Sequence, residues 1–173
     1  MSKPGKFKIA LALMSIPSAV HAQTAPKCIP KPQVRDATIV LMPFLIDATR
    51  KRCTASLPAT AFLKSTAATD FANRLEKERP AREHSAAEAL RALGGDDPDS
   101  RLMSDKTILN GVGEMLAGKA VEKADSNRCD DLNSFLDALS PMPAEKVGVL
   151  VTAFFSIADV GGDKSGSPKI CAT

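Results

Sequence analysis

Four cysteines set the strongest constraint on how this chain can fold, because they are few, widely spaced and even in number. They are Cys28, Cys53, Cys129 and Cys171 of the 173 residues. No two of them stand in Cys-x-x-Cys spacing and no cluster of histidines accompanies them, which disfavours a zinc site or a redox centre. In an exported chain, four such residues most simply form two structural disulfides, for which three connectivities are possible.

The N-terminus has the features of an export signal. Three lysines within residues 1–8 precede an apolar stretch over residues 9–16, and Val20-His21-Ala22 offers small residues at the usual cleavage spacing. Residues 1–22 are therefore predicted to be a secretory signal peptide. A membrane anchor would need about 20 apolar residues. The processed chain is expected in the periplasm or outside the cell, without stable insertion into a membrane.

Composition narrows the functional classes for the remaining residues, 23–173. The chain is 44% hydrophobic and 25% charged, the balance of an ordinary packed domain. Three of the 23 basic residues leave with the signal, so 20 basic residues face 20 acidic ones. Without a net positive charge, nucleic acid is not an expected partner. The absence of Trp and Tyr disfavours sites that stack sugars or bases on large rings.

Helical periodicity and helix caps predict an all-α fold. We expect one domain, a compact bundle of five or six helices stapled by two disulfides. The apolar runs Ile39 to Ile46 and Val147 to Ala158 place the first and last helices innermost. The predicted helices cover 34–52, 56–80, 85–94, a stretch from Ser104, 129–139 and a stretch from 143 or 144. Pro43 lies inside the first helix, and Pro80 ends the second. Residues 23–33 are predicted to be an extended leader and residues 163–173 a polar tail.

The length of the first helix disfavours one of the three disulfide connectivities. If residues 34–51 form one helix, it spans about 25 Å at 1.5 Å per residue. The five-residue stretch that follows Cys28 reaches at most about 17 Å. Cys28 therefore meets Cys53 only if Pro43 breaks the helix sharply. The predicted pairs are Cys53 with Cys129 and Cys28 with Cys171, and the second pair ties the two terminal segments together.

The order of these landmarks resembles a group of small exported bacterial proteins without an assigned function. The resemblance covers most of the processed chain. It rests on Cys28, on Arg52-Cys53 followed by Leu57-Pro58 and Phe62-Leu63, on Cys129, on Leu139-Ser140-Pro141-Met142-Pro143 and on Ile170-Cys171. The resemblance implies an all-α fold and no particular activity.

No group of residues predicts a catalytic, cofactor-binding or metal site. His84 is the only histidine that remains after the signal, and it immediately precedes a predicted helix start at Ser85. The adjacent Glu83 would point about 100° away on a helix, so it could not orient the imidazole. The acidic loop over residues 94–100 lacks the order of an EF-hand, and no serine stands in a Gly-x-Ser-x-Gly turn. We therefore expect no cofactor.

These absences favour a non-catalytic protein of the cell envelope that binds another protein, such as an inhibitor, an immunity-type protein or a chaperone-like factor. One alternative is a carrier of a small molecule or lipid. A weaker alternative is a hydrolase that uses carboxylates as acid and base. An exposed apolar patch would favour the first function, an apolar cavity above about 300 Å³ the second, and converging carboxylates the third. The carrier cavity would be built from Leu41, Phe44, Met115, Phe154 and Phe155.

Overall fold

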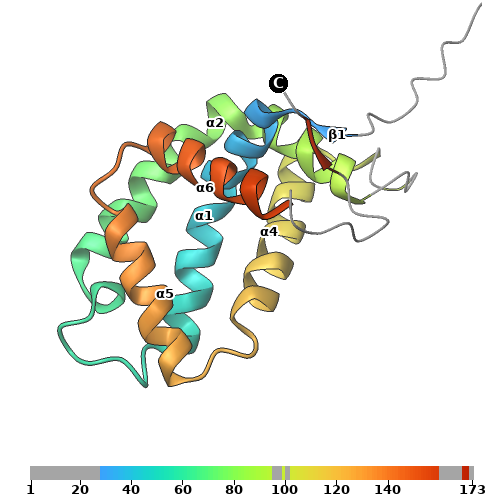
Figure 1. Ribbon diagram of the computed structural model, residues 1–173. Coiled ribbons are helices and arrows are strands. Elements are labelled where there is room, and N and C mark those ends of the chain that lie inside the picture. The colour runs from blue at the N-terminus through green and yellow to red at the C-terminus, as the bar shows by residue number, and fades with distance from the viewer. Residues whose placement is uncertain (1–27, 95–98, 100–101, 160–168, 172–173) are drawn as a thin grey trace, which may run out of the picture.

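The computed structural model describes residues 28–94, 99, 102–159 and 169–171, and this part of the chain confirms the predicted helical bundle (Figure 1). The predicted signal peptide lies outside the described residues, as does most of the acidic loop. The elements are β1 (Cys28–Ile29), α1 (Lys31–Cys53), the 3₁₀ turn η1 (Phe62–Lys64), α2 (Thr66–Gly94), α4 (Asp105–Val121), α5 (Ser126–Leu139), α6 (Ala144–Asp159) and β2 (Lys169–Ile170).

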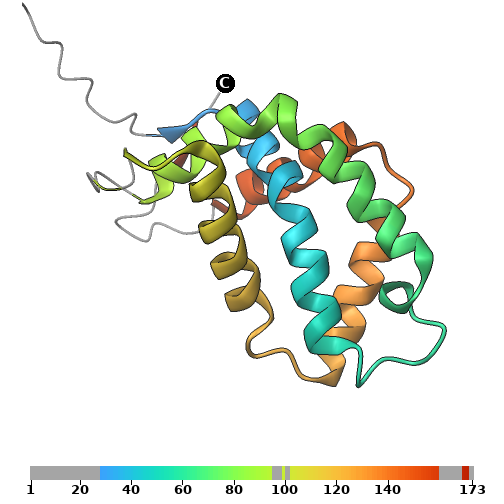
Figure 2. The same cartoon turned by 180° about the vertical axis from the view of Figure 1, so that it is seen from behind.

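Helix α1 is the centre of the bundle, as its apolar run predicts. Helix α2 packs along it on the side seen in Figure 2, α4 packs beside it, and α5 and α6 lie on the side seen in Figure 1. Ile39 and Ile46 of α1 are buried against Phe71 and Leu75 of α2 and against residues of α5 and α6. A second cluster joins Val40 to the last turns of α2 and to the start of α4.

Helix α2 continues through Pro80, which corrects the predicted end at this residue and the predicted new start at Ser85. A proline inside a helix removes one hydrogen bond and costs about 3 kcal/mol. Pro80 is exposed, while α2 buries Phe71 and Leu75 before it and Leu90 after it. Burial on both sides of the proline therefore outweighs the lost bond. The start is also corrected, because α2 begins at Thr66, after η1, and not at Ser56.

Both predicted disulfides are present. Cys28 bonds to Cys171, and Cys53 bonds to Cys129. The first bridge lies beside a two-residue parallel pairing of β1 with β2, in which Ile29 is opposite Ile170. Helix α1 begins at Lys31, so the predicted extended leader ends earlier than residue 33. Cys53 and Cys129 are buried, whereas Cys28 and Cys171 are partly exposed.

The burial pattern corrects a second prediction. The apolar run of helix α6 predicts that it is innermost, and this prediction is wrong. Helix α6 buries only the side with Val147, Gly148 and Thr152. Leu93, Met115, Leu116 and Phe135, which periodicity predicts to face inward, are 40–51% exposed. In the described part of the chain, no helix is both long enough and apolar enough to span a bilayer.

Two glycines allow neighbouring helices to approach α1 closely. A Cβ atom on Gly113 of α4 would lie 2.9 Å from Cδ2 of Phe44, and one on Gly148 of α6 would lie 3.0 Å from the carbonyl oxygen of Arg35. A Cβ atom on Gly118 would meet nothing within 4 Å. Glycine is therefore needed where α4 and α6 cross α1, and it is dispensable at position 118.

We expect opposite effects from alanine at these two kinds of position. Gly148→Ala should lower the free energy of unfolding by about 1–2 kcal/mol, because overpacking against Arg35 exceeds the gain in helix propensity. Gly118→Ala should raise it by about 0.5–1 kcal/mol. Urea unfolding followed by circular dichroism measures both. A stabilising Gly148→Ala would show that α6 does not press on α1 as described.

Candidate functional site

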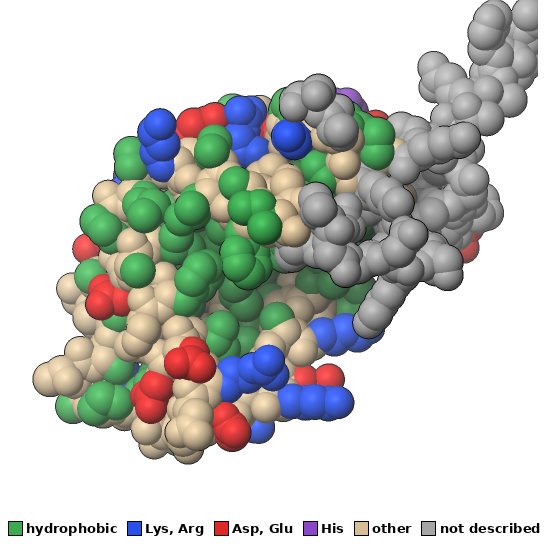
Figure 3. Space-filling model, viewed as in Figure 1, with side chains coloured by type: hydrophobic (Ala, Val, Ile, Leu, Met, Phe, Trp, Pro, Cys, Tyr) green, Lys and Arg blue, Asp and Glu red, His purple; other side chains and the backbone are tan. Residues whose placement is uncertain are grey.

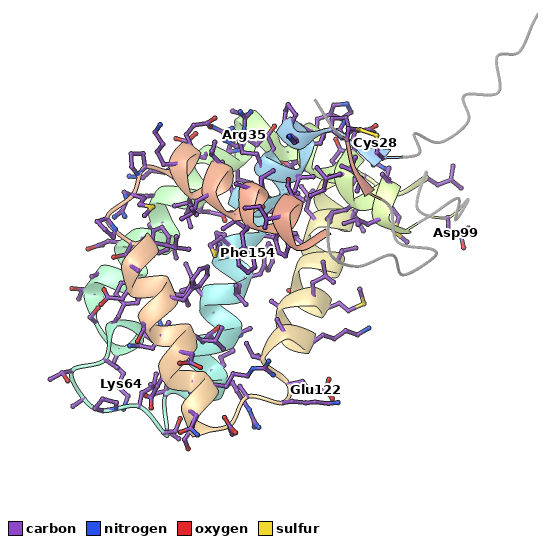
Figure 4. All side chains as sticks on the ribbon, viewed as in Figure 1. Cys28, Arg35, Lys64, Asp99, Glu122 and Phe154 are labelled. Atoms are coloured by element: carbon purple, nitrogen blue, oxygen red, sulfur yellow. A yellow bond between two sulfur atoms is a disulfide. The ribbon has the colours of Figure 1, made fainter. Side chains whose placement is uncertain are left out.

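The densest group of charges lies where α1, α2 and α6 meet. Nη1 of Arg82 in α2 donates to Oδ1 of Asp36 in α1 at 2.8 Å, and its Nη2 donates to Oε2 of Glu145 in α6 at 3.0 Å. Arg35, labelled in Figure 4, reaches Oε1 of Glu145 at 2.8 Å. Burial opposes the charged form of Arg82, but Asp36 and then Glu145 outweigh that effect and raise its pKa.

This ion cluster has the properties of a structural salt-bridge network that links helices. Each of its carboxylates, including Glu78 at 3.3 Å, is bound by at least one guanidinium. A carboxylate hydrolase needs one group to give a proton and another to take it, whereas these carboxylates are held as salt-bridge acceptors. The cluster ties three helices together and offers no free acid and base pair.

A second polar contact joins α2 to the start of α4. Nδ1 of His84 lies 2.9 Å from Oδ2 of Asp105, and Nη2 of Arg91 donates to Oδ1 of Asp105 at 2.7 Å. The hydrogen bond to His84, followed by that to Arg91, lowers the pKa of Asp105. His84 is 81% exposed and lies within α2, not at the helix start that the sequence predicts. Its position fits an exposed polar contact that links α2 to the start of α4.

An apolar ridge follows the outer side of α6. Leu150, Ala153, Phe154 and Ile157 recur at intervals of three and four residues, so they lie on one side of the helix. Leu150, Phe154 and Ile157 are 47%, 68% and 75% exposed, and Ala153 is exposed as well. Figure 4 shows Phe154 beside α6, toward the open front of α1. We call these four residues the α6 ridge.

An apolar hollow lies beside this ridge, over the front of α1. Helices α4 and α6 contact different sides of α1, through Gly113 and Gly148, and Leu41 and Leu45 lie on the stripe between, both partly exposed. Leu116 of α4 is 40% exposed and Phe135 of α5 is 46% exposed. On α5, Asn133 accepts a hydrogen bond from the backbone of Leu63, and Phe135, two residues on, lies on the opposite side of the helix.

Leu41, Leu45, Leu116 and Phe135 define the hollow. Figure 3 shows hydrophobic side chains gathered on this face below α6, with Asp, Glu, Lys and Arg side chains at its lower margin. The α6 ridge has no ionisable residue between positions 147 and 157. Ridge and hollow together form one continuous apolar face, which we call the front face.

Two grooves lie elsewhere on the described surface, one lined by polar residues and one by charged and apolar residues together. One, of about 540 Å³, is lined by Asp70, Asn73, Arg74, Glu76 and Lys77. Another, of about 580 Å³, lies between α1, α2 and α4. There the guanidinium carbon Cζ of Arg79 lies 5.5 Å from the centre of the Phe44 ring. The residues predicted for a carrier cavity do not come together in either groove. Leu41 lies in the hollow, Phe154 lies on the ridge, and Phe44 lines the second groove.

Metal ligands do not gather in the described residues, where no group of three His, Cys, Asp or Glu side chains could hold an ion. Comparisons with protein families, with curated proteins and with solved structures find no match for this chain. The resemblance to small exported four-cysteine proteins therefore stays a prediction, and the candidate site rests on its own geometry.

Helical spacing does not predict the front face, because apolar residues at that spacing are typical of a buried core. The uncharged run from Val147 to Ala158 predicts burial on all sides, but α1 covers only one side of α6. One signal in the sequence was that these helices have more apolar residues than one neighbouring helix can bury. Phe135 and Leu116 stand directly beside the buried Leu136 and Ala117, so each helix has a wider apolar sector than one neighbour can cover.

Proposed function

We propose that this chain is a non-catalytic exported protein of the cell envelope that binds another protein through the front face, as an inhibitor, an immunity-type protein or a chaperone-like factor. The observation that carries the proposal is the α6 ridge beside the hollow. Monomeric proteins rarely expose contiguous apolar patches beyond a few hundred Å², and larger patches commonly mark interaction sites. The two disulfides fit an oxidising compartment.

The face suits a protein better than a small ligand. A small-molecule site encloses most of its ligand, whereas the hollow is open along the front of α1 and is continuous with a convex ridge. Aromatic and aliphatic anchors at the centre with charges at the margin are the usual anatomy of a protein interface. Phe135 and Phe154 would be the aromatic anchors.

The test is affinity capture from an envelope extract with the processed, oxidised protein, followed by mass spectrometry of bound protein and lipid. Phe154→Asp should abolish capture of a stoichiometric protein that the unchanged chain retains. Leu102→Asp is the matched control, because Leu102 is 87% exposed in the connection between α2 and α4. Binding should then be reproduced with the purified partner. A stoichiometric lipid without a protein, or equal loss in both variants, would contradict the proposal.

A further inference from the structure

The front face has a convex part and a concave part side by side. The α6 ridge is convex, because it is the outer side of a single helix, and the hollow is concave, because α4, α5 and α6 stand around an incompletely covered stripe of α1. Both are apolar, and they lie side by side on one face of the molecule. An isologous contact between two copies requires both complementary surfaces on the same patch, and this patch has them.

We propose that a second copy of this chain occupies the front face in the absence of another partner, with the α6 ridge of each copy seated in the hollow of the other. The proposal uses the same face as the proposed function, but it rests on self-complementarity and not on the identity of a partner. A two-fold axis parallel to α6 between the two faces produces this arrangement. Two equivalent ridge-and-hollow contacts close the dimer.

The direction of α6 sets the register of this contact. Figure 1 shows that α6 crosses α1 with its C-terminal end toward α4. A rotation about an axis parallel to α6 keeps positions along that helix. Ile157 of each ridge therefore lies over Leu116 on the α4 side of the opposite hollow, and Leu150 lies toward Phe135 on the α5 side.

The available area fits a dimer of ordinary size. Leu116, Phe135, Leu150, Phe154 and Ile157 are 40–75% exposed. With roughly 200 Å² for each large apolar side chain, together they present about 500 Å². A standard interface buries about 800 Å² on each partner, of which about 65% is apolar in homodimers. The front face therefore supplies the apolar area that one side of such a dimer needs.

Charge does not oppose the pairing. The ridge has no ionisable residue from 147 to 157, and the predicted processed chain has equal numbers of acidic and basic residues. Two copies consequently meet without net repulsion, and no charge from positions 147–157 of the ridge is buried at the contact. Because a dimer covers the face that a different protein would use, binding of that protein competes with self-association. Dimerisation would thus regulate access to the site.

Sedimentation velocity over a concentration series tests the proposal with the processed, oxidised protein. The unchanged chain should pass from monomer to dimer as its concentration rises. Ile157→Lys in the ridge and Leu116→Asp in the hollow should each weaken self-association by about 30-fold, as expected for central interface positions. Leu102→Asp, outside the front face, should leave it unchanged.

Mixing the two interface variants gives the decisive result. In a heterodimer, Lys at position 157 of one copy meets Asp at position 116 of the other, while the second ridge and hollow are both unchanged. The mixture should therefore associate at concentrations where each variant alone is monomeric. Failure of the mixture to associate would overturn the reciprocal arrangement.

Two further measurements distinguish a failure of the dimer proposal from misfolding of a variant and from a failure of the proposed function. Circular dichroism and thermal unfolding confirm that each variant is folded. If Leu116→Asp unfolds, Leu150→Lys and Phe135→Asp, which also face each other across the contact, replace the pair Ile157→Lys and Leu116→Asp. An unchanged chain that remains monomeric up to about 200 μM, well above a micromolar dissociation constant, overturns the dimer without any variant. It leaves the proposed function standing, because that function is tested separately by the capture of a different protein and its dependence on Phe154.

Discussion

Replacing both Cys53 and Cys129 by alanine is expected to lower the free energy of unfolding by about 4 kcal/mol, the largest effect of any change proposed for this protein. The bridge spans 76 residues and joins the end of α1 to the first turn of α5. Its loss releases chain entropy in the unfolded state. It also loosens a buried contact, because both cysteines are almost fully buried. Urea unfolding under non-reducing conditions measures the loss.

The second bridge is the matched control. Cys28 and Cys171 are partly exposed and lie at the two terminal strands, whose pairing covers only two residues on each side. After Cys28→Ala and Cys171→Ala, the terminal segments can separate while the helices stay packed. The bridge spans 143 residues, so its loss releases more chain entropy in the unfolded state than loss of the inner bridge, but the separated ends gain entropy in the folded state as well. We therefore expect a smaller loss, about 2 kcal/mol. A larger loss from the terminal pair than from the inner pair would show that the ends, and not α5, limit the stability of the bundle.

Arg82→Met is expected to lower the free energy of unfolding by about 3 kcal/mol, the second largest effect. The side chains of Arg82 and Asp36 are only 18% and 11% exposed. Removing the guanidinium leaves the carboxylate of Asp36 poorly solvated, with only Arg35 at 3.4 Å. Removing one partner of a buried pair costs more than the pair itself contributes. Urea unfolding with circular dichroism again gives the number.

Two comparisons show whether that loss comes from the pair. The double variant Asp36→Ala with Arg82→Met should be less destabilised than the sum of the two single variants, by at least about 1 kcal/mol. Lys51→Met, which breaks an exposed pair with Asp47, should leave the free energy of unfolding nearly unchanged, because solvent screens that pair. Strict additivity of the two single variants would show that Arg82 acts through packing and not through Asp36.

Local rules predict the helical bundle and disfavour one of the three disulfide connectivities. Both predicted disulfides are present, but the choice between the other two connectivities depends on how the helices pack. The apolar run in α1 requires a central helix, and the length of that helix keeps Cys28 away from Cys53. At Pro80 the local penalty of a proline inside a helix predicts a helix end, and this prediction is wrong. Contacts of α2 with α1 on both sides of the proline reverse that prediction, and such contacts are not visible in a local pattern.

Only some residues of the candidate site were predicted from the sequence to belong to a binding site. Leu41 and Phe154 were predicted as parts of an apolar binding site, but as the lining of an enclosed cavity. Leu116 and Phe135 were assigned to the core, because periodicity shows which side of a helix is apolar and not how many neighbours cover it. A wide apolar sector looks the same in the sequence whether a second helix, solvent or another molecule covers it.

By itself, the amino-acid sequence determined the class of fold and the central position of α1, and it disfavoured the pairing of Cys28 with Cys53, since each follows from spacing along the chain. Only the tertiary structure decided that α6 is covered on one side, that α4 and α5 stand apart around the front of α1, and that ridge and hollow share one face. The physical reason is that burial depends on the positions of all neighbouring helices at once, and spacing within one helix does not contain them.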